Sequence, residues 1–378
     1  MRFMHLSDLH LGKRVNEFSM LEDQEYILLQ ILQVLDREKP EGVIIAGDIY
    51  DKPVPPAEAV SLFDRFLYAL YQRGKQVFMV SGNHDSAERV SVNGRIMEPS
   101  GIHISPAYTG TVRPAELTDE YGKLYVYLLP FVKPAHVRAA FPEKEISSYT
   151  QAVAAAVEEM KVNPLERNLL VTHQFVTGAE RSDSEEISVG GTDNVDATVF
   201  DCFDYVALGH IHGPQRIGRD TLRYCGTPLK YSFSERNHVK SLTIVDMKEK
   251  GTVEIRTIPL KPKHDMREIK GTYDGLMHRG HSEGAEALDY MHVVLTEEED
   301  VPDAVARLRT VYPNLMKLDY DNTRTRTQAV IDGTDNADGK SEIELFEEFY
   351  EKQNGKPMSG EQKRFSETLL EKLREVEA

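Results

Sequence analysis

Aspartate, asparagine and histidine residues directly follow five short apolar runs in about the first 215 residues of the chain. The first of these segments is SDLHLG, in which Asp8 and His10 stand two residues apart. Residues i and i+2 point to the same side of an extended chain, so this carboxylate and this imidazole could bind one metal ion together. The stretch could equally be a polar surface loop, and the choice depends on whether other segments supply further donors.

Four later segments repeat the design of an apolar run, small residues and then Asp, Asn or His. They read IIAGDIYD, MVSGNHDS, LLVTHQF and ALGHIHG, and their donors are Asp48, Asn83, His173, His210 and His212. A single residue of this kind is more often a turn former or an ordinary hydrogen-bonding group than a ligand, and only the recurrence favours metal binding. Because the carboxyl ends of parallel strands line the ligand crevice of an open α/β sheet, we expect the five segments to converge on one edge.

Oxygen and imidazole donors without cysteine suit divalent ions such as Mn²⁺, Fe²⁺ or Zn²⁺. Seven donors exceed what one ion needs, so we expect two ions about 3.5–4 Å apart that share one carboxylate. Asp48 is the natural bridge because it has no donor partner in its own segment. One ion would then be held by Asp8, His10 and His212, and the other by Asn83, His173 and His210. Such a pair converts water to hydroxide and neutralises phosphate oxygens, which predicts phosphoester hydrolysis.

His84 directly follows Asn83 and is not needed in this set of ligands. Adjacent residues usually point apart, so His84 can face the substrate while Asn83 faces the metal. We expect it to hydrogen-bond the phosphate or to protonate the leaving oxygen. The alternative is a histidine that only supports the structure around a ligand.

Short strands and amphipathic helices must position these donors. Apolar runs predict strands at 2–7, 42–48, 76–82, 123–130, 168–173 and 205–210, and helical periodicity predicts helices at 21–38 and 56–73. Three further strands, at 221–227, 241–247 and 252–258, follow one another without a helix between them. This order favours an α/β layered fold that ends in meandering strands.

A second part of the chain begins after the Pro- and Lys-rich stretch PLKPKHD at 259–265. Beyond it, 290–298, 302–313 and 315–322 read as strand, helix and strand, which makes a small α/β module. The polar stretch 323–341 reads as a flexible tether. Two amphipathic helices follow, one at about 342–353 and one from a capping box at Ser359. These helices either fold back on the parent domain or dock into a groove of another protein.

The composition is that of a globular protein, with 40% hydrophobic and 28% charged residues. No run approaches the roughly 18 apolar residues of a membrane span, and the N-terminus lacks a signal-peptide pattern, so we expect a cytoplasmic protein without membrane contact. Cys202 and Cys225 fit no metal or redox spacing and are expected to be free thiols.

A net charge of −17 argues against a broad basic surface for nucleic acid, although a partner could supply positive charge to a DNA enzyme. Local phosphate contacts could come from Lys13, Arg14, Arg89 and Arg95, which could equally be solvated surface charges.

The ordered blocks DLH, GDIYD, GNHD, TH and GHIH resemble the calcineurin-like metallophosphoesterase superfamily, whose pattern is D-x-H, G-D, G-N-H-D/E, H and G-H-x-H. The resemblance covers about the first 215 residues. It implies a layered α/β/β/α sandwich with a two-metal site, and it supports the seven ligands named above. GDIYDKPVPP lacks the arginine that protein Ser/Thr phosphatases carry shortly after this block, which counts against that branch.

The flanking residues SDLHLGK, AGDIYDKPVPP, SGNHDSAERV and GHIHGPQ are similar to those of the SbcD nuclease subunits. This resemblance implies an Mn²⁺-dependent DNA nuclease that acts as an exonuclease on duplex ends and as an endonuclease on single strands or hairpins. It also implies ATP-linked control by the SbcC ATPase in a two-plus-two complex, a homodimer, and a role in DNA break and hairpin processing. Mg²⁺, Fe²⁺ and Zn²⁺ remain alternatives to Mn²⁺.

The predicted organisation follows from the segments and this resemblance together. We expect a nuclease domain at 1–260, a DNA-binding α/β capping domain at 265–325, a linker at 326–340 and an SbcC-docking helical segment at 341–378. One alternative is a small-molecule phosphodiesterase or phosphatase, which would use the same metals. The other is a non-catalytic scaffold with a vestigial metal site, but such a site should have lost ligands and all seven are present.

Overall fold

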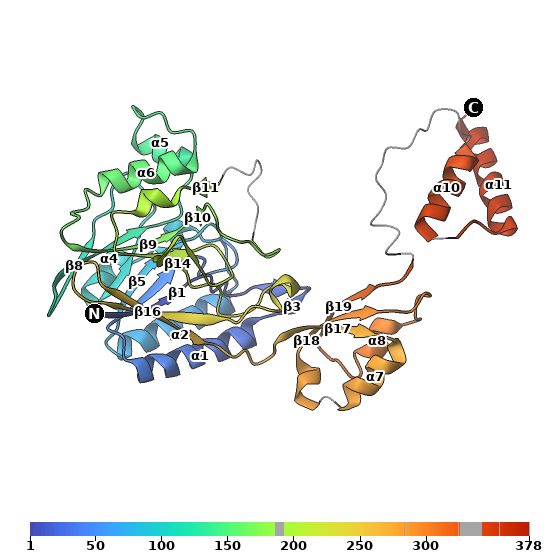
Figure 1. Ribbon diagram of the computed structural model, residues 1–378, viewed down its shortest axis with the longest axis horizontal. Coiled ribbons are helices and arrows are strands. Elements are labelled where there is room, and N and C mark those ends of the chain that lie inside the picture. Colours follow the sequence, from blue (N-terminus) through green and yellow to red (C-terminus); the bar gives the residue numbers. More distant parts are fainter. Residues whose placement is uncertain (186–192, 283, 324, 326–341, 355, 378) are drawn as a thin grey trace. The chain divides into compact units, whose positions relative to one another are not determined.

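The computed structural model describes residues 1–185, 193–282, 284–323, 325, 342–354 and 356–377 (Figure 1). The chain divides into two compact units, Met1–Met266 and a second unit from Arg267 onward. Each unit is described by itself. The predicted linker at 326–340 lies outside the described residues.

The first sheet of unit 1 has six strands in the order β16-β15-β1-β4-β5-β6. Its strands are β1 (Arg2–Leu6), β4 (Gly42–Ala46), β5 (Gln76–Val80), β6 (Ile102–Ile104), β15 (Ser241–Met247) and β16 (Val253–Pro259). The four strands β1, β4, β5 and β6 run parallel, while β15 and β16 are antiparallel to their neighbours. The ends of β1, β4 and β5 therefore reach the same edge of this sheet.

The second sheet also has six strands, in the order β13-β14-β12-β9-β8-β7. They are β7 (Ala115–Asp119), β8 (Gly122–Leu129), β9 (Arg167–His173), β12 (Tyr205–Gly209), β13 (Gln215–Ile217) and β14 (Arg219–Tyr224). The central strands β8, β9, β12 and β14 are parallel, and β7 and β13 pair antiparallel at the two edges. The expected strand at 221–227 ends early, because Gly226 turns the chain with a φ of +78°.

The inner faces of the two sheets pack on one another. Phe3, Ile44 and Phe78 of the first sheet share a buried cluster with Leu169 and Ala207 of the second. Helices α1 (Leu21–Glu38) and α2 (Ala57–Gln72) lie on the first-sheet side, and α5 (Pro134–Ala140) and α6 (Tyr149–Glu159) on the second-sheet side (Figure 1). The predicted α/β/β/α sandwich is confirmed.

Local sequence explains where these helices begin and what they bury. Helix α6 starts at a capping box, in which the Ser148 hydroxyl accepts from the Gln151 amide and the Gln151 side chain accepts from the Ser148 amide. Its Val153 and Ala156 pack in the same cluster as strand β9 of the second sheet. The sequence patterns had not predicted α5, α6, β6 or β7, which are short or only weakly periodic.

Smaller elements complete unit 1. They are β2 (Arg14–Val15), β3 (Phe18–Ser19), α3 (Ala87–Val90), α4 (Gly94–Met97), β10 (Phe175–Val176), β11 (Asn194–Val195), and the 3₁₀ helices η1 (Glu98–Ser100), η2 (Ala197–Phe200) and η3 (Phe233–Glu235). Cys202 and Cys225 are free thiols, as predicted. None of the helices in the described residues is long and apolar enough to cross a membrane.

The second unit contains a three-stranded sheet of β17 (Met266–Gly271), whose first residue ends unit 1, β18 (Tyr290–Leu295) and β19 (Leu315–Tyr320). Its helices are α7 (Tyr273–Ser282), η4 (Gly284–Leu288) and α8 (Ala304–Leu308). Leu276, Met291, Leu308 and Tyr312 are among the residues of its separate apolar core. The strand, helix and strand predicted at 290–322 are present, preceded by a strand and a helix that were not predicted.

The last described elements are α10 (Glu342–Asn354) and α11 (Gly360–Glu377). They contact one another, since the Gln362 side chain donates to the Tyr350 hydroxyl at 2.9 Å. The predicted capping box is present, with the Ser359 amide donating to Gln362 Oε1 at 2.9 Å and the Gln362 amide donating to Ser359 Oγ at 3.3 Å. Large apolar side chains stay open on both helices: Phe346, Phe349, Phe365 and Leu369 are 43%, 55%, 68% and 45% exposed.

Candidate metal centre

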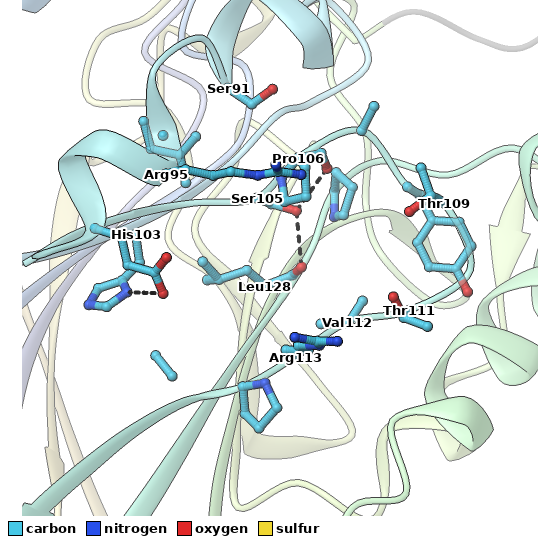
Figure 2. A pocket seen from close by; sticks show the side chains of 18 of the residues that line it. Ser91, Arg95, His103, Ser105, Pro106, Thr109, Thr111, Val112, Arg113 and Leu128 are labelled. Atoms are coloured by element: carbon cyan, nitrogen blue, oxygen red, sulfur yellow. Dashed lines mark hydrogen bonds and ion pairs between the residues drawn. The ribbon is translucent and has the colours of Figure 1, made fainter.

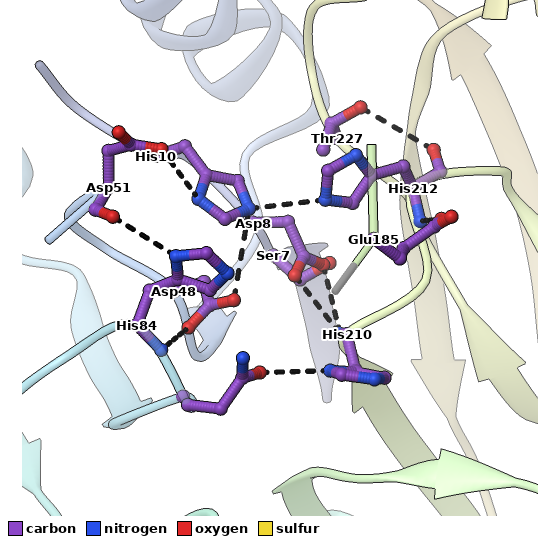
Figure 3. A network of polar contacts seen from close by, with 12 residues as sticks. Ser7, Asp8, His10, Asp48, Asp51, His84, Glu185, His210, His212 and Thr227 are labelled. Atoms are coloured by element: carbon purple, nitrogen blue, oxygen red, sulfur yellow. Dashed lines mark hydrogen bonds and ion pairs between the residues drawn. The ribbon is translucent and has the colours of Figure 1, made fainter. Parts of the chain in front are cut away.

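The eight side chains predicted to do chemistry lie together, around the ends of strands from both sheets. Figure 3 shows Asp8, His10, Asp48, His84, His210 and His212 among them. Asp8 and His10 follow β1, Asp48 follows β4, and Asn83 and His84 follow β5; His173 ends β9, and His210 and His212 follow β12. The expectation that all of them converge on one sheet edge is therefore wrong, because three segments come from the first sheet and two from the second. The donors face one another because the two sheets are stacked.

The loops that carry the donors are tied to one another through the backbone. The Asp8 amide donates to the Gly47 carbonyl at 3.0 Å, and the His10 amide donates to the Asp48 carbonyl at 2.9 Å. Asp8, His10 and Asp48 all have positive φ angles, of 52°, 43° and 47°. Residues other than glycine rarely adopt this conformation, and it persists where the surrounding structure enforces it, as at functional sites.

Two glycines allow the strand ends to approach closely. A Cβ atom on Gly82 would lie 2.0 Å from Asp48 Oδ1, and one on Gly209 would lie 1.8 Å from the Ala46 carbonyl oxygen. Gly209 stands at the end of β12 in the second sheet and Ala46 at the end of β4 in the first. The small residues in these motifs thus let the two sheets close around the donors.

The first predicted set of ligands is tightly grouped and buried. One ligand atom from each of Asp8, His10 and His212 lies within 4.8 Å of the others. The Nε2 atoms of His10 and His212 are 3.2 Å apart. Two ring nitrogens can face each other at this distance if one donates a proton to the other, or if both bind the same cation.

The second predicted set meets at the Asn83 side chain. Its Oδ1 atom is 2.9 Å from His173 Nε2 and 2.9 Å from His210 Nδ1. Asp48 Oδ2 is 3.2 Å from His173 Nε2 and 3.8 Å from His10 Nε2. The Asp48 carboxylate therefore lies between the two sets, where a bridging ligand would have to be.

Burial and neighbouring charges shift the protonation of this cluster. Burial lowers the pKa of His10 and His210 well below the ordinary value, which keeps these imidazoles neutral. Burial also raises the pKa of Asp8 to about 6, with Asp48 adding to the rise. For Asp48, burial acts in the same direction, but the charge and hydrogen bond of His173 outweigh it, and its pKa lies far below the usual range.

The donor atoms fit a divalent cation. Neutral imidazoles and ionised carboxylates are the forms in which these side chains bind metals. Burial lowers the pKa of His173, but the charge and hydrogen bond of Asp48 outweigh it and raise this pKa to about 9, so a cation would displace a proton there. His210 Nε2 is buried and has no hydrogen-bond partner among the described residues. Buried polar atoms are nearly always paired, so this nitrogen is suited to a ligand that the polypeptide does not supply.

His84 lies at the rim of the cluster and is only partly buried. Its Nδ1 atom is 3.0 Å from the Asp51 carbonyl oxygen, and its ring centroid is 4.8 Å from that of His10. A carbonyl only accepts, so Nδ1 carries the hydrogen of this bond. Nε2 is then the atom that can exchange a proton with a substrate, although His84 also lies within 4.8 Å of a His10–Asp48 ligand pair.

A buried polar network behind His212 had not been predicted from the sequence. His212 Nδ1 is 2.6 Å from Ser184 Oγ and 3.3 Å from Glu235 Oε1. Lys240 Nζ forms an ion pair with Glu235 and donates to the His212 carbonyl at 2.9 Å. These residues belong to no motif, and no local pattern could have connected them with His212.

Asp85 was also missed as a functional residue, although it stands inside the GNHD block. Its carboxylate accepts hydrogen bonds from the amides of Ile49, Tyr50 and Gly82 at 3.1, 3.0 and 3.0 Å. It therefore joins the loop after β4 to the loop after β5. Its place in the block, next to His84, was the only sign of this role.

Comparison with known proteins gives matches over most of the chain. The family model described as calcineurin-like phosphoesterase matches residues 1–214, and the one described as type 5 capsule protein repressor C-terminal domain matches residues 262–354. The SbcD subunit of the nuclease SbcCD from Staphylococcus epidermidis is 33% identical over 322 residues, which cover 84% of this chain and 85% of that protein. A dimetal phosphatase from Danio rerio aligns at 14% identity and a TM-score of 0.42, over 69% of this chain and 99% of the phosphatase.

Proposed function

Since the chain belongs to the calcineurin-like phosphoesterase family, in its branch of SbcD nuclease subunits, we propose that it cleaves DNA at a two-metal centre. The members of this branch are metal-dependent phosphodiester hydrolases, and each is a subunit of a nuclease. The proposed activities are exonuclease action on duplex ends and endonuclease action on single strands or hairpins, together with the SbcC ATPase in DNA break and hairpin processing. The observation that supports this best is the grouping of six donor side chains around Asp48.

We assign the metal ligands in two sets with one shared member. Asp8, His10 and His212 would hold one ion, Asn83, His173 and His210 the other, and Asp48 both. Mn²⁺ is the proposed ion because the resemblance to SbcD nuclease subunits implies it, while a set of only oxygen and imidazole donors also suits Fe²⁺ or Zn²⁺. When bound, such a pair supplies a water-derived nucleophile at neutral pH and offsets the negative charge of the phosphodiester.

The protein's own groups have three tasks in this proposal. The loops after β1 and β4 hold Asp8 and Asp48 in place through the backbone hydrogen bonds between them. Asn83, His173 and His210 hold their donor atoms together, since Asn83 Oδ1 lies 2.9 Å from both His173 Nε2 and His210 Nδ1. His84 Nε2 delivers a proton to the leaving oxygen, while the Asp51 carbonyl fixes the ring through Nδ1.

The proposal gives the α/β module of the second unit a role in DNA contact and the last two helices a role in binding SbcC. We propose that 265–325 caps the nuclease domain and contacts DNA, and that the segment at 341–378 docks onto the coiled coil of SbcC. The exposed phenylalanines of α10 and α11 support this docking, because two short helices leave an apolar face that they cannot bury against each other. A homodimer in a two-plus-two complex with SbcC completes the proposed assembly.

The test is cleavage of blunt duplex and hairpin DNA by the purified protein with SbcC and Mn²⁺. We expect Asp48→Asn to lower the rate by more than about 100-fold, and the exposed control Asp220→Asn to leave it unchanged. Intact DNA with the unsubstituted protein, or equal cleavage by Asp48→Asn, would overturn the proposal. Faster turnover of cyclic nucleotides or phosphomonoesters than of DNA would instead identify a small-molecule phosphodiesterase.

A further inference from the structure

A cavity of about 920 Å³ opens between helix α4 and the irregular chain that links β6 to β7 (Figure 2). Strand β6 is the edge of the first sheet and β7 is the edge of the second. Residues 105–114 form one wall without regular secondary structure. This volume is near the upper end of the ~300–1,000 Å³ of ligand pockets, so the cavity can take an extended molecule.

The cavity is lined by more positive than negative charge, in a chain whose net charge is −17. Arg95 enters it from α4, and Arg113 from the segment before β7 (Figure 2). Neither guanidinium forms an ion pair with any residue that the structure describes. Among the lining residues only Glu98 is acidic, and its carboxylate lies 4.0 Å from His103 Nδ1.

Other lining residues suit the bases of a nucleic acid. Leu128 and Pro130 contribute apolar surface, and Tyr108 is half-buried. The Tyr108 hydroxyl is buried and has no hydrogen-bond partner among the described residues. Proteins that bind single strands combine cationic grooves for the phosphates with aromatic and apolar surfaces for unstacked bases. A duplex keeps its bases stacked and cannot offer them to such a surface.

Two short stretches of chain connect the lining of the cavity with the Asn83 and His173 side of the metal centre. Pro130 lines the cavity, and the ring of the next residue, Phe131, has its centroid 6.2 Å from that of His173. The Phe131 amide donates to the Ser81 carbonyl at 2.9 Å, directly before the loop of Asn83. On the other wall, Ser91 ends the short helix α3 that follows the same loop.

We propose that this cavity binds the phosphodiester backbone of a single DNA strand that extends from the metal centre. Arg95 and Arg113 contact two phosphates, and the apolar wall takes the intervening bases. The inference rests on the proposed nuclease function and names the path of one strand of its substrate. A free nucleotide shares the phosphate chemistry but fills only part of the cavity.

The test measures fluorescence anisotropy of a labelled 12-nucleotide strand with the whole 378-residue chain in EDTA, where cleavage cannot occur. We expect Arg95→Glu/Arg113→Glu to weaken strand binding by at least about tenfold. The slope of log K against log salt should fall in magnitude by about 1.4, since each phosphate contact of a single strand contributes about 0.7. Duplex affinity should change less than about twofold, and thymidine monophosphate should compete only weakly.

The charge-matched control is Arg37→Glu/Arg216→Glu, in which both arginines are exposed and lie outside the cavity. It should bind the strand as the unsubstituted protein does. The proposal is overturned if both double variants bind the strand equally, if duplex affinity falls as far as strand affinity, or if polyglutamate competes as well as the strand. Equal competition by thymidine monophosphate would overturn it in favour of a mononucleotide site. Cleavage with Mn²⁺ is measured separately, so a protein that binds the strand but never cuts it contradicts the nuclease proposal alone.

Discussion

At the scale of single residues, a substitution of His84 can distinguish proton transfer from metal binding, because His84 lies outside both proposed sets of ligands. We expect His84→Ala to keep its metal content and to lose about 10²–10⁴-fold in the rate of DNA cleavage. The loss should be much smaller with bis-p-nitrophenyl phosphate, whose leaving group needs no proton. Metal content measured after dialysis and the two rates check this. Equal losses on both substrates would assign His84 a different role.

Glu235 is a positioning residue for His212, since its carboxylate lies 3.3 Å from the ring nitrogen that faces away from the metal centre. Burial raises its pKa, but the hydrogen bond of His212 and the charge of Lys240 outweigh this, so its pKa lies well below the usual range. The carboxylate therefore stays ionised and can orient the imidazole. We expect Glu235→Gln to weaken Mn²⁺ binding by about 10–100-fold, measured by titration followed with electron paramagnetic resonance.

That substitution also leaves the Lys240 ammonium buried without its partner, which costs about 3–5 kcal/mol of stability. Glu235→Gln/Lys240→Met removes both charges and separates the two effects. The weaker metal binding should persist in the double variant, and the exposed control Glu254→Gln should bind Mn²⁺ normally. Normal binding by a folded double variant would show that Glu235 serves stability alone.

The motifs were sufficient to predict which side chains gather at the centre, but not what supports them. Asp8, His173 and their fellow donors each follow an apolar run and a small residue, which is a local pattern. Glu235 and Lys240 stand in the stretch SERNHVK, which has no such pattern. Their role arises only because the chain returns to the back of His212 after β14, and such a contact is set by tertiary packing.

At the scale of elements, the sequence predicted the central strands well because each is a continuous buried run, as in GVIIA of β4. It could not assign them to sheets, since a fully buried strand reads the same in either one. The prediction therefore placed all the donors at one edge of a single sheet, whereas they lie at the edges of two sheets. The edge strands β6 and β7 were missed because they are short or only half-buried.

The substitution Gly82→Ala tests how closely the loop after β5 must approach Asp48. A methyl group there would lie 2.0 Å from Asp48 Oδ1 and 2.5 Å from its amide nitrogen. We expect Gly82→Ala to lower the free energy of unfolding by about 1–3 kcal/mol, as overpacking does, and to abolish Mn²⁺-dependent cleavage. Urea denaturation and the cleavage assay measure the two effects. Gly360→Ala is the control, since a Cβ there meets nothing within 4 Å; unchanged activity in Gly82→Ala would show that the Asp48 position tolerates displacement.

At the scale of the whole molecule, the last two helices are predicted to connect the nuclease to its partner. We expect Phe346→Glu/Phe349→Glu to weaken binding to SbcC by at least about 100-fold, because burying each phenylalanine contributes about 1.5–3 kcal/mol. Cleavage of bis-p-nitrophenyl phosphate should be unaffected. Co-sedimentation with SbcC measures the affinity.

The matched control for these helices is Leu29→Glu/Leu165→Glu, in which two leucines that are 56% and 84% exposed in unit 1 gain the same charges. It should bind SbcC normally. If the phenylalanine variant also binds normally, the helices do not form the docking surface.

The placement of the donors on two stacked sheets has a consequence for the folding of unit 1. An ion held by Asp48 and His173 is also a cross-link between the first sheet and the second, so metal occupancy and sheet association are thermodynamically linked. At a free ion concentration 100 times the dissociation constant, each site adds about 2.7 kcal/mol to the free energy of unfolding. We therefore expect chelation to lower the melting temperature measured by calorimetry, and Mn²⁺ to restore it. An unchanged melting temperature would mean that the sandwich closes without help from the ions.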